Sequence, residues 1–149
     1  MSNKPIPRTL DQVREKLPVS LLPFQLLLYL DYCFMIITFI MMIILFIIKY
    51  NIIPFSIGWT FGEPVVIFAY LIIQIIRIKI GTNANLKESF LSAIIFLILS
   101  AAVIVNYVFW LIWQSVITKY DLVIDILGLI ITSGEVLLSI LLVILMIHR

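Results

Sequence analysis

The chain has 149 residues, of which 64% are hydrophobic and 12% are charged, and its formal net charge is +2. Soluble domains are roughly half apolar and a quarter charged, so a water-soluble fold of this length could not bury so much apolar surface. The sequence therefore predicts an integral membrane protein in a lipid bilayer. The few cations flank apolar segments, which argues against a nucleic acid partner.

Residues 1–22 are predicted to form a cytosolic N-terminal segment. Within it, residues 9–17 have the pattern of a short amphipathic helix, with Thr9 and Gln12 placed as a capping box and Pro18 as the stop. Such a helix would rest on lipid headgroups or on a partner, while a frayed tail is an equally good interpretation of so short a segment. About 20 polar and mixed residues precede the first apolar run, so this run is expected to stay in the membrane as a signal anchor.

Residues 23–149 are predicted to form the transmembrane domain. Crossing the hydrocarbon core takes about 20 apolar residues in a helix. Four segments are long enough, and they cover residues 25–48, 64–80, 90–113 and 123–147. Their connections are short, which favours up-down-up-down packing. The predicted fold class is an all-α membrane protein, a four-transmembrane antiparallel helix bundle.

The positive charges indicate the orientation of the bundle. With a cytosolic N-terminus, eight of the ten Lys and Arg residues lie on the cytosolic side, and only Lys49 and Lys119 lie opposite. This asymmetry follows the positive-inside rule. Both termini and the loop at residues 81–89 are therefore predicted to be cytosolic.

The second predicted helix begins at Glu63–Pro64, which is suited to a first turn, and ends at Arg77 and Lys79. Both cationic side chains would reach the headgroups by snorkelling. Gln74 and Arg77 also share one helix face at a spacing of three, so they could bind a neighbouring helix or a lipid headgroup instead.

A glycine and an asparagine follow this helix. Gly81 is expected to supply the left-handed residue that ends it, and Asn85 to hydrogen-bond the backbone of the turn. The sequence thus predicts that residues 77–86 form a rigid, basic cytosolic recognition element.

Glu135 lies near the middle of the fourth predicted helix. Gly128, Thr132 and Ser139 fall on its face at helical spacing, and such a stripe lets a neighbouring helix approach closely. One interpretation is a packing carboxyl that hydrogen-bonds another helix. The other is a carboxylate that couples protons or ions. Against the second, the chain shows no clear internal repeat or broken helix.

Other polar residues inside the spans are interpreted as helix contacts. Asp31 lies near the cytosolic end of the first helix, where it could reach water or Arg77, and Asn106 lies about two turns from the end of the third. The predicted helix-packing and interaction residues are Asp31, Gln74, Arg77, Gly81, Asn85, Asn106, Gly134 and Glu135.

Residue patterns for covalent chemistry are not found. The only histidine is His148, the only cysteine is Cys33 inside a span, and Gly81-Thr82 lacks the spaced glycines and lysine of a phosphate-binding loop. We therefore predict that the protein is not an enzyme and has no catalytic residues, no cofactor and no metal site.

Several short motifs carry a resemblance from about Pro23 to the C-terminus. They are Pro23-x-Gln25 with Leu30-Asp31, Lys49-Tyr50 with Pro54, Tyr70-Leu71-x-Ile73-Gln74-x-Ile76-Arg77, Gly81-Thr82-x-x-Asn85-Leu86, and Gly134-Glu135 with Leu137-Leu138. The chain resembles the Transmembrane-17 family, four-span proteins of the ciliary transition zone. Gln74 stands where an acidic residue is expected in the family, so only a hydrogen bond to Arg77 remains possible there.

The resemblance implies a structural or assembly subunit of the transition-zone membrane complex, the Meckel and Joubert module, at the cilium base. Its expected partners are tectonic-type and other membrane proteins, and its expected role is in ciliogenesis and the ciliary diffusion barrier. Two alternatives stay open. One is a small ion- or proton-coupled transporter that uses Glu135, and the other is an accessory subunit of another membrane complex, such as a respiratory one.

Overall fold

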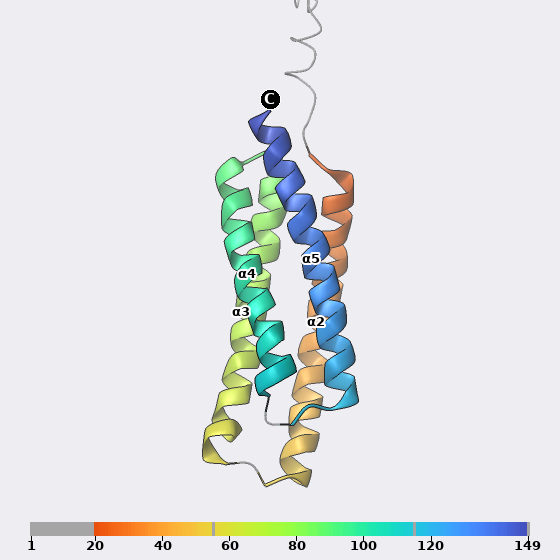
Figure 1. Cartoon of the computed structure of the whole chain (residues 1–149), viewed down its shortest axis with the longest axis vertical. Helices are drawn as coiled ribbons and strands as arrows, with labels where there is room; N and C mark the ends of the chain where they lie inside the picture. The colour runs from red at the N-terminus through yellow and green to blue at the C-terminus, as the bar shows by residue number, and fades with distance from the viewer. Residues whose placement is uncertain (1–19, 55, 115, 149) are drawn as a thin grey trace, which may run out of the picture.

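The computed structural model describes residues 20–54, 56–114 and 116–148, and these residues form four long helices (Figure 1). The helices are α2 (Leu22–Ile52), α3 (Ile57–Leu86), α4 (Phe90–Trp113) and α5 (Lys119–Ile147). Each is long and apolar enough to cross a membrane. The predicted four-span antiparallel bundle is confirmed. The helix predicted at residues 9–17 lies outside the described residues.

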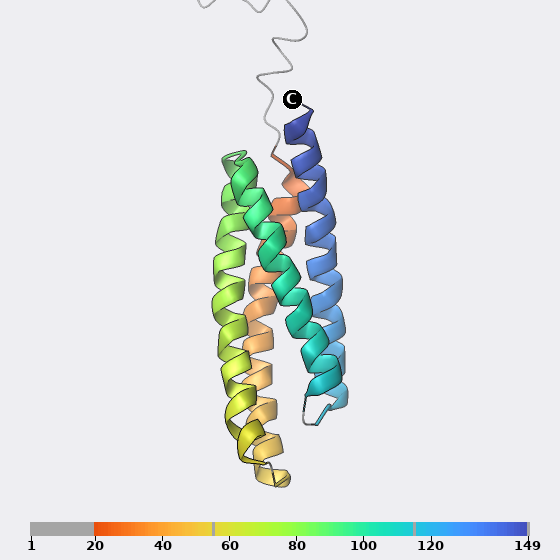
Figure 2. The same cartoon turned by 60° about the vertical axis from the view of Figure 1, so that its left-hand side comes forward.

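The helices form a closed ring of contacts. Each helix packs against its neighbours in sequence, and α2 also packs against α5. Figures 1 and 2 both place the start of α2, the end of α5 and the α3–α4 connection at one end of the bundle. At the other end, the α2–α3 connection extends beyond the α4–α5 connection (Figure 1).

Helix α4 coincides with the span predicted at residues 90–113. Helix α3 extends beyond both ends of the span predicted at residues 64–80 (Figure 1). It begins at Ile57, so Pro64 lies inside it and not in its first turn. It continues to Leu86, and the interpretation of residues 81–86 as a loop is wrong. The connection to α4 comprises only residues 87–89, where Glu88 takes the left-handed conformation with φ 51°.

Packing explains why Gly81 does not end the helix. A Cβ atom at this position would lie 2.8 Å from the ring of Phe96 and 3.1 Å from Leu28. No glycine of the chain has a positive φ among the described residues, so the left-handed role predicted for Gly81 is wrong. The small residue serves a close approach of α3 to α2 and α4.

The inner faces of the helices follow one repeat. Buried positions recur at alternating intervals of three and four residues, an average of about 3.5, which is typical of helices that pack at a shallow angle. In α2 these positions are Phe24, Leu28, Asp31, Met35, Thr38, Met42, Leu45 and Lys49. In α5 they are Asp121, Asp125, Gly128, Thr132, Glu135, Ser139 and Leu142. The inner stripe of α5 is thus mostly polar.

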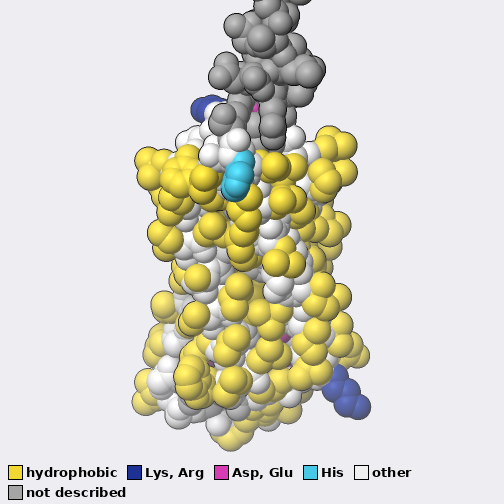
Figure 3. All heavy atoms as spheres, turned by 45° about the horizontal axis from the view of Figure 1, so that its top comes forward, with side chains coloured by type: hydrophobic (Ala, Val, Ile, Leu, Met, Phe, Trp, Pro, Cys, Tyr) yellow, Lys and Arg dark blue, Asp and Glu magenta, His cyan; other side chains and the backbone are white. Residues whose placement is uncertain are grey.

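The outer surface is apolar. Figure 3 shows one face covered by hydrophobic side chains over its whole height, with Lys and Arg side chains visible only near its two ends. Exposed leucine, isoleucine, valine and aromatic side chains occur on all four helices. Because lipid chains solvate such a surface, the bundle is built for a bilayer, with polar groups inside and apolar groups outside.

Membrane topology is the first testable expectation. Both termini and residues 87–89 should face the cytosol, because most of the Lys and Arg residues belong to that end of the bundle. Residues 53–56 and 114–118 should face the opposite side. Glycosylation acceptor segments inserted in each connection would report this directly. Modification is expected at the second pair of sites, and modification of an acceptor at residues 87–89 would contradict the orientation.

Candidate functional site

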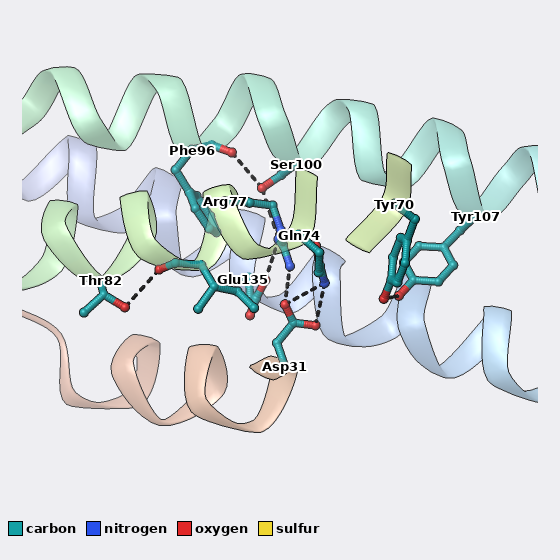
Figure 4. Close-up of polar contacts among 10 residues, drawn as sticks. Asp31, Tyr70, Gln74, Arg77, Thr82, Phe96, Ser100, Tyr107 and Glu135 are labelled. Atoms are coloured by element: carbon teal, nitrogen blue, oxygen red, sulfur yellow. Dashed lines mark hydrogen bonds and ion pairs between the residues drawn. The ribbon is translucent and has the colours of Figure 1, made fainter. Parts of the chain in front are cut away.

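Arg77 lies on the inner face of α3, and its side chain is 0% exposed. The predicted snorkelling to the headgroups is therefore wrong. One guanidinium nitrogen, Nη2, donates to Oδ2 of Asp31 on α2 (Figure 4). The other, Nη1, lies 2.6 Å from Oε2 of Glu135 on α5. The arginine thus joins three helices by two ion pairs.

Gln74 completes the link between α3 and α2. Its side-chain oxygen accepts a hydrogen bond from Nε of Arg77 at 2.9 Å. Its amide nitrogen donates to Oδ1 and Oδ2 of Asp31 at 3.1 and 2.9 Å. An amide suits this position because it can accept from the guanidinium and donate to the carboxylate at once. A carboxylate here could not donate to Asp31.

Helix α4 contributes Ser100. Its hydroxyl oxygen lies 3.3 Å from Nη1 of Arg77, and the hydroxyl donates to the backbone oxygen of Phe96 at 2.8 Å. The Arg77 guanidinium carbon also lies 5.3 Å from the centre of the Phe96 ring, within range of a cation–π interaction. We call Asp31, Gln74, Arg77, Ser100 and Glu135 the Arg77 cluster, and it includes at least one residue from each helix (Figure 4).

Electrostatics makes the Arg77 cluster a strong constraint on the fold. All five side chains are fully buried, and two carboxyl groups face one guanidinium. A charge buried without a partner is costly, and removal of one member of a buried ion pair typically destabilises by about 3–5 kcal/mol. A bilayer interior offers no bulk water to solvate an unpaired charge, so the helices that carry these charges must keep their register.

Asn85 joins the end of α3 to the start of α2. Its Oδ1 accepts from the backbone nitrogen of Leu21 at 2.8 Å, and its Nδ2 donates to the Leu21 carbonyl at 3.1 Å and to Gln25 at 3.3 Å. The residue is 1% exposed. The proposed recognition role as a loop residue is therefore wrong for Asn85, which acts inside the protein.

The remaining predicted residues lie apart from the Arg77 cluster. A Cβ atom on Gly134 would lie 3.3 Å from Leu27, so this glycine contributes to the approach of α5 to α2. Asn106 is half-buried on α4, and its Oδ1 has no hydrogen-bond partner among the described residues. Neither residue is brought to Arg77.

A further buried ion pair lies away from Arg77, and the sequence did not lead us to predict it. Nζ of Lys49 on α2 lies 2.6 Å from Oδ2 of Asp121 on α5, and both side chains are almost fully buried. Asp121 also caps its own helix, because Oδ2 accepts from the Thr118 backbone nitrogen at 2.8 Å. Asp125 lies one turn further along α5 and is fully buried.

The helical spacing of these residues could have indicated this pair. Lys49 falls on the inner stripe of α2, and Asp121 and Asp125 fall on that of α5. Lys49 was predicted to lie on the side opposite the cytosol because it stands near the end of an apolar run. Residues at a helix end can equally lie on its inner face, and the three-and-four spacing distinguishes the two cases.

The chemistry of the site favours a packing role. No group of three or more His, Cys, Asp or Glu residues that could hold a metal ion is found in the part of the chain that the structure describes. Arg77 is engaged by two carboxyl groups, a side-chain amide and a hydroxyl. These contacts fix four helices relative to one another.

Comparison with known proteins agrees with this architecture. Residues 26–132 match the model of the Transmemb_17 family, described as predicted membrane proteins. The chain belongs to this family. The matched segment runs from the first turns of α2 into α5 and contains Asp31, Gln74, Arg77 and Ser100, but it stops before Glu135. No curated protein and no solved structure matches the chain.

Loss of Arg77 should destabilise the bundle. Arg77→Met leaves two buried carboxyl groups without their cation, so the free energy of unfolding in a bilayer should fall by about 3–5 kcal/mol. The matched control is Lys79→Met, which removes an exposed cation two residues along α3 and should have little effect. Equal destabilisation by both variants would contradict the burial of Arg77.

Glu135 should tolerate an amide but not an apolar side chain. Glu135→Gln keeps an oxygen that can accept from Nη1 of Arg77, so the bundle should stay nearly as stable. Glu135→Leu leaves that nitrogen only the 3.3 Å contact to Ser100. Because Asp31 still neutralises the guanidinium, the expected loss is that of one interhelical hydrogen bond in a membrane, roughly 1 kcal/mol, and not that of an unpaired charge. A pH-dependent transport current that the Gln variant abolishes would contradict the packing role.

Asn85→Ala should loosen the start of α2. The substitution removes both hydrogen bonds to the Leu21 backbone, so the Leu21 amide hydrogen should exchange faster with solvent. Asn83→Ala is the control, because Asn83 is exposed two residues earlier on the same helix. Unchanged exchange at Leu21 in the Asn85 variant would show that this contact does not hold the helix end.

Proposed function

We propose that the protein is a structural and assembly subunit of the ciliary transition-zone membrane complex, where it supports ciliogenesis and the membrane diffusion barrier. Membership of the Transmemb_17 family supports the proposal together with the motifs at Gly81-Thr82 and Asn85-Leu86. In this proposal the protein is a multi-pass membrane protein at the cilium base with cytosolic termini. Tectonic-type membrane proteins are its proposed partners.

The Arg77 cluster is the observation that carries the assembly role. It uses the buried charges at the centre of the bundle to lock α2, α3, α4 and α5 together. A bundle locked in this way keeps a fixed outer shape, and a fixed surface is what a subunit offers to the neighbours that pack against it. Lipid-facing side chains remain free to contact the helices of other membrane proteins.

The end of α3 presents two different faces. Arg77, Gly81 and Asn85 are buried and hold the bundle together. Lys79 and Leu86 are exposed, and Leu86 is 64% exposed. If the family's most recognisable segment also binds partners, it does so with its outer face. The proposed contact for cytosolic adaptors is therefore Lys79, Asn83, Leu86 and Lys87.

The transporter alternative receives less support from the geometry. Its key residue, Glu135, is fully buried and paired with Arg77 of α3. Transporter sites commonly use discontinuous helices, whereas each of the four described helices is unbroken. Flux measured in proteoliposomes separates this alternative from a structural role. Localisation in cells distinguishes the proposed transition-zone subunit from an accessory subunit of another complex, such as a respiratory one.

Localisation tests the proposal, and an outer-face variant tests its mechanism. The tagged protein should concentrate at the cilium base and co-purify with tectonic-type proteins. Leu86→Ala combined with Lys79→Ser should lower that recovery without lowering the amount of membrane-inserted protein, because both side chains point outward. Leu137→Ala on α5 is the matched control, since this leucine is 69% exposed.

One result would contradict the proposal, and another would contradict its outer-face contact. A uniform plasma-membrane or mitochondrial distribution would remove the transition-zone role. Normal recovery of partners with the Leu86 and Lys79 variant would place the binding surface elsewhere on the bundle, and the assembly role would then depend on the lipid-facing sides of the helices.

A further inference from the structure

The inner face of α5 carries an unusual run of polar side chains. We call Asp121, Asp125, Thr132, Glu135 and Ser139 the α5 seam, and all five are fully buried. From Asp121 to Ser139 the seam covers 18 residue steps of helix, or about 27 Å at 1.5 Å per residue. The hydrocarbon core of a bilayer is about 30 Å thick. The seam therefore extends along most of the depth of the membrane.

Several atoms of the seam have no hydrogen-bond partner among the described residues. They are both carboxyl oxygens of Asp125, Oδ1 of Asp121, Oε1 of Glu135, and the hydroxyl oxygens of Thr132 and Ser139. A hydroxyl can rotate to bond its own helix backbone, but a carboxylate only accepts and needs a separate donor. Each buried polar group left without a partner costs about 1–3 kcal/mol, and more if it is charged.

The two cations near these oxygens each pair with a different oxygen, and Nζ of Lys49 has donors to spare, since it makes no hydrogen bond among the described residues. Nζ of Lys49 lies on Oδ2 of Asp121 at 2.6 Å, and Nη1 of Arg77 lies on the other oxygen of Glu135. A metal cation is a poor occupant, because the ammonium and the guanidinium already stand beside these carboxyl groups. A small neutral donor that can also accept is the group that fits.

The hydroxyl of Tyr107 fills the one gap in the seam. A Cβ atom on Gly128 would lie 2.5 Å from this oxygen, so the tyrosine hydroxyl occupies the place of a side chain between Asp125 and Thr132. It is also hydrogen-bonded to the hydroxyl of Tyr70 at 2.9 Å (Figure 4). Successive polar groups thus follow one another at about one helical turn, or 5.4 Å.

That spacing matches a bridging water molecule. Two hydrogen bonds of about 2.8 Å that meet at one water oxygen join polar atoms about 4.5 Å apart, and at most about 5.6 Å apart, so one water or two in sequence can bridge each step of the seam. Internal waters typically make three bonds to groups that otherwise lack partners. We propose that the α5 seam binds a file of water molecules inside the membrane, which satisfies Asp125 and Glu135 and links the Lys49–Asp121 pair to the Arg77 cluster.

The file is closed at the end where the termini lie. Beyond Ser139 the core consists of Phe24, Leu28, Phe96 and Leu142, all of which are at most 1% exposed. The edge of the Phe24 ring packs on Phe96 with ring centres 5.4 Å apart. This apolar cluster separates the bound water from the cytosolic end, so the seam is an internal hydration site and not a path across the membrane.

Solid-state NMR of the full chain in lipid bilayers tests the water file. With carbon-13 in the side-chain carboxyl groups of Asp and Glu and in the methyl groups of Leu, polarisation transferred from water protons should reach Asp125 and Glu135. It should not reach Leu142 in the apolar cluster. Transfer to the two carboxyl carbons that is no greater than transfer to Leu142 would overturn the proposal.

A conservative variant tests the continuity of the file. Thr132→Val keeps the shape of the side chain but removes its hydroxyl, so transfer to Glu135 should be lost while transfer to Asp125 is retained. Thr82→Val is the matched control, because the Thr82 hydroxyl donates to its own Ile78 carbonyl at 2.9 Å, outside the seam. Unchanged transfer to Glu135 in the Thr132 variant would overturn the continuous file.

Discussion

A single cation buried in the bilayer interior sets the arrangement of this protein. Arg77 cannot reach bulk water from the inner face of α3, so its guanidinium depends on partners from the other helices. These partners are Asp31 on α2, Ser100 on α4 and Glu135 on α5. Gln74, which lies on α3 with Arg77, holds Asp31 in place by a hydrogen bond. A shift of α2, α3 or α5 by one turn would move a charged partner by about 5.4 Å and leave a charge alone, and a shift of α4 would remove the Ser100 contact. The cluster therefore determines the register of all four helices, which apolar packing by itself would leave loosely defined.

Lipid reverses the usual distribution of side chains between inside and outside. Because lipid tails are as apolar as leucine, burial of apolar side chains does little to hold helices together, and small residues and polar contacts carry more of the specificity. Gly81 and Gly128 allow Phe96 and Tyr107 to lie against the backbones of α3 and α5. Polar groups then occur in layers along the axis, from Lys49 and Asp121 at one end to the Arg77 cluster nearer the other. The outer surface stays apolar over its whole height, as contact with lipid chains requires.

The number, order and direction of the helices could be predicted from sequence, because a bilayer demands long apolar runs and short connections keep neighbours antiparallel. The inner face of α5 could also be predicted, since Gly128, Thr132, Glu135 and Ser139 share one helical face. Partners in space could be predicted only in part: Asp31 was expected to reach water or Arg77, but the pairing of Arg77 with Glu135, 58 positions away, depends on how the helices pack. Cations near the ends of apolar runs were the main source of error. In the sequence, Arg77 and Lys49 both stand near the end of an apolar run, where a cationic side chain can snorkel. In the structure each helix continues past its cation, which lies on the inner face.

The most direct test of the central claim is a double-mutant cycle between Arg77 and Asp31, measured as the free energy of unfolding in a lipid bilayer. The cycle compares Arg77→Met, Asp31→Leu and the double variant, and it isolates the energy that the two side chains share. If the Arg77 cluster joins α2 to α3, the double variant should be more stable than the sum of the single losses implies, with a coupling of about 0.5–3 kcal/mol. Losses that add to within about 0.3–0.5 kcal/mol would mean that the two residues do not meet, and they would contradict the account of how this bundle is held together.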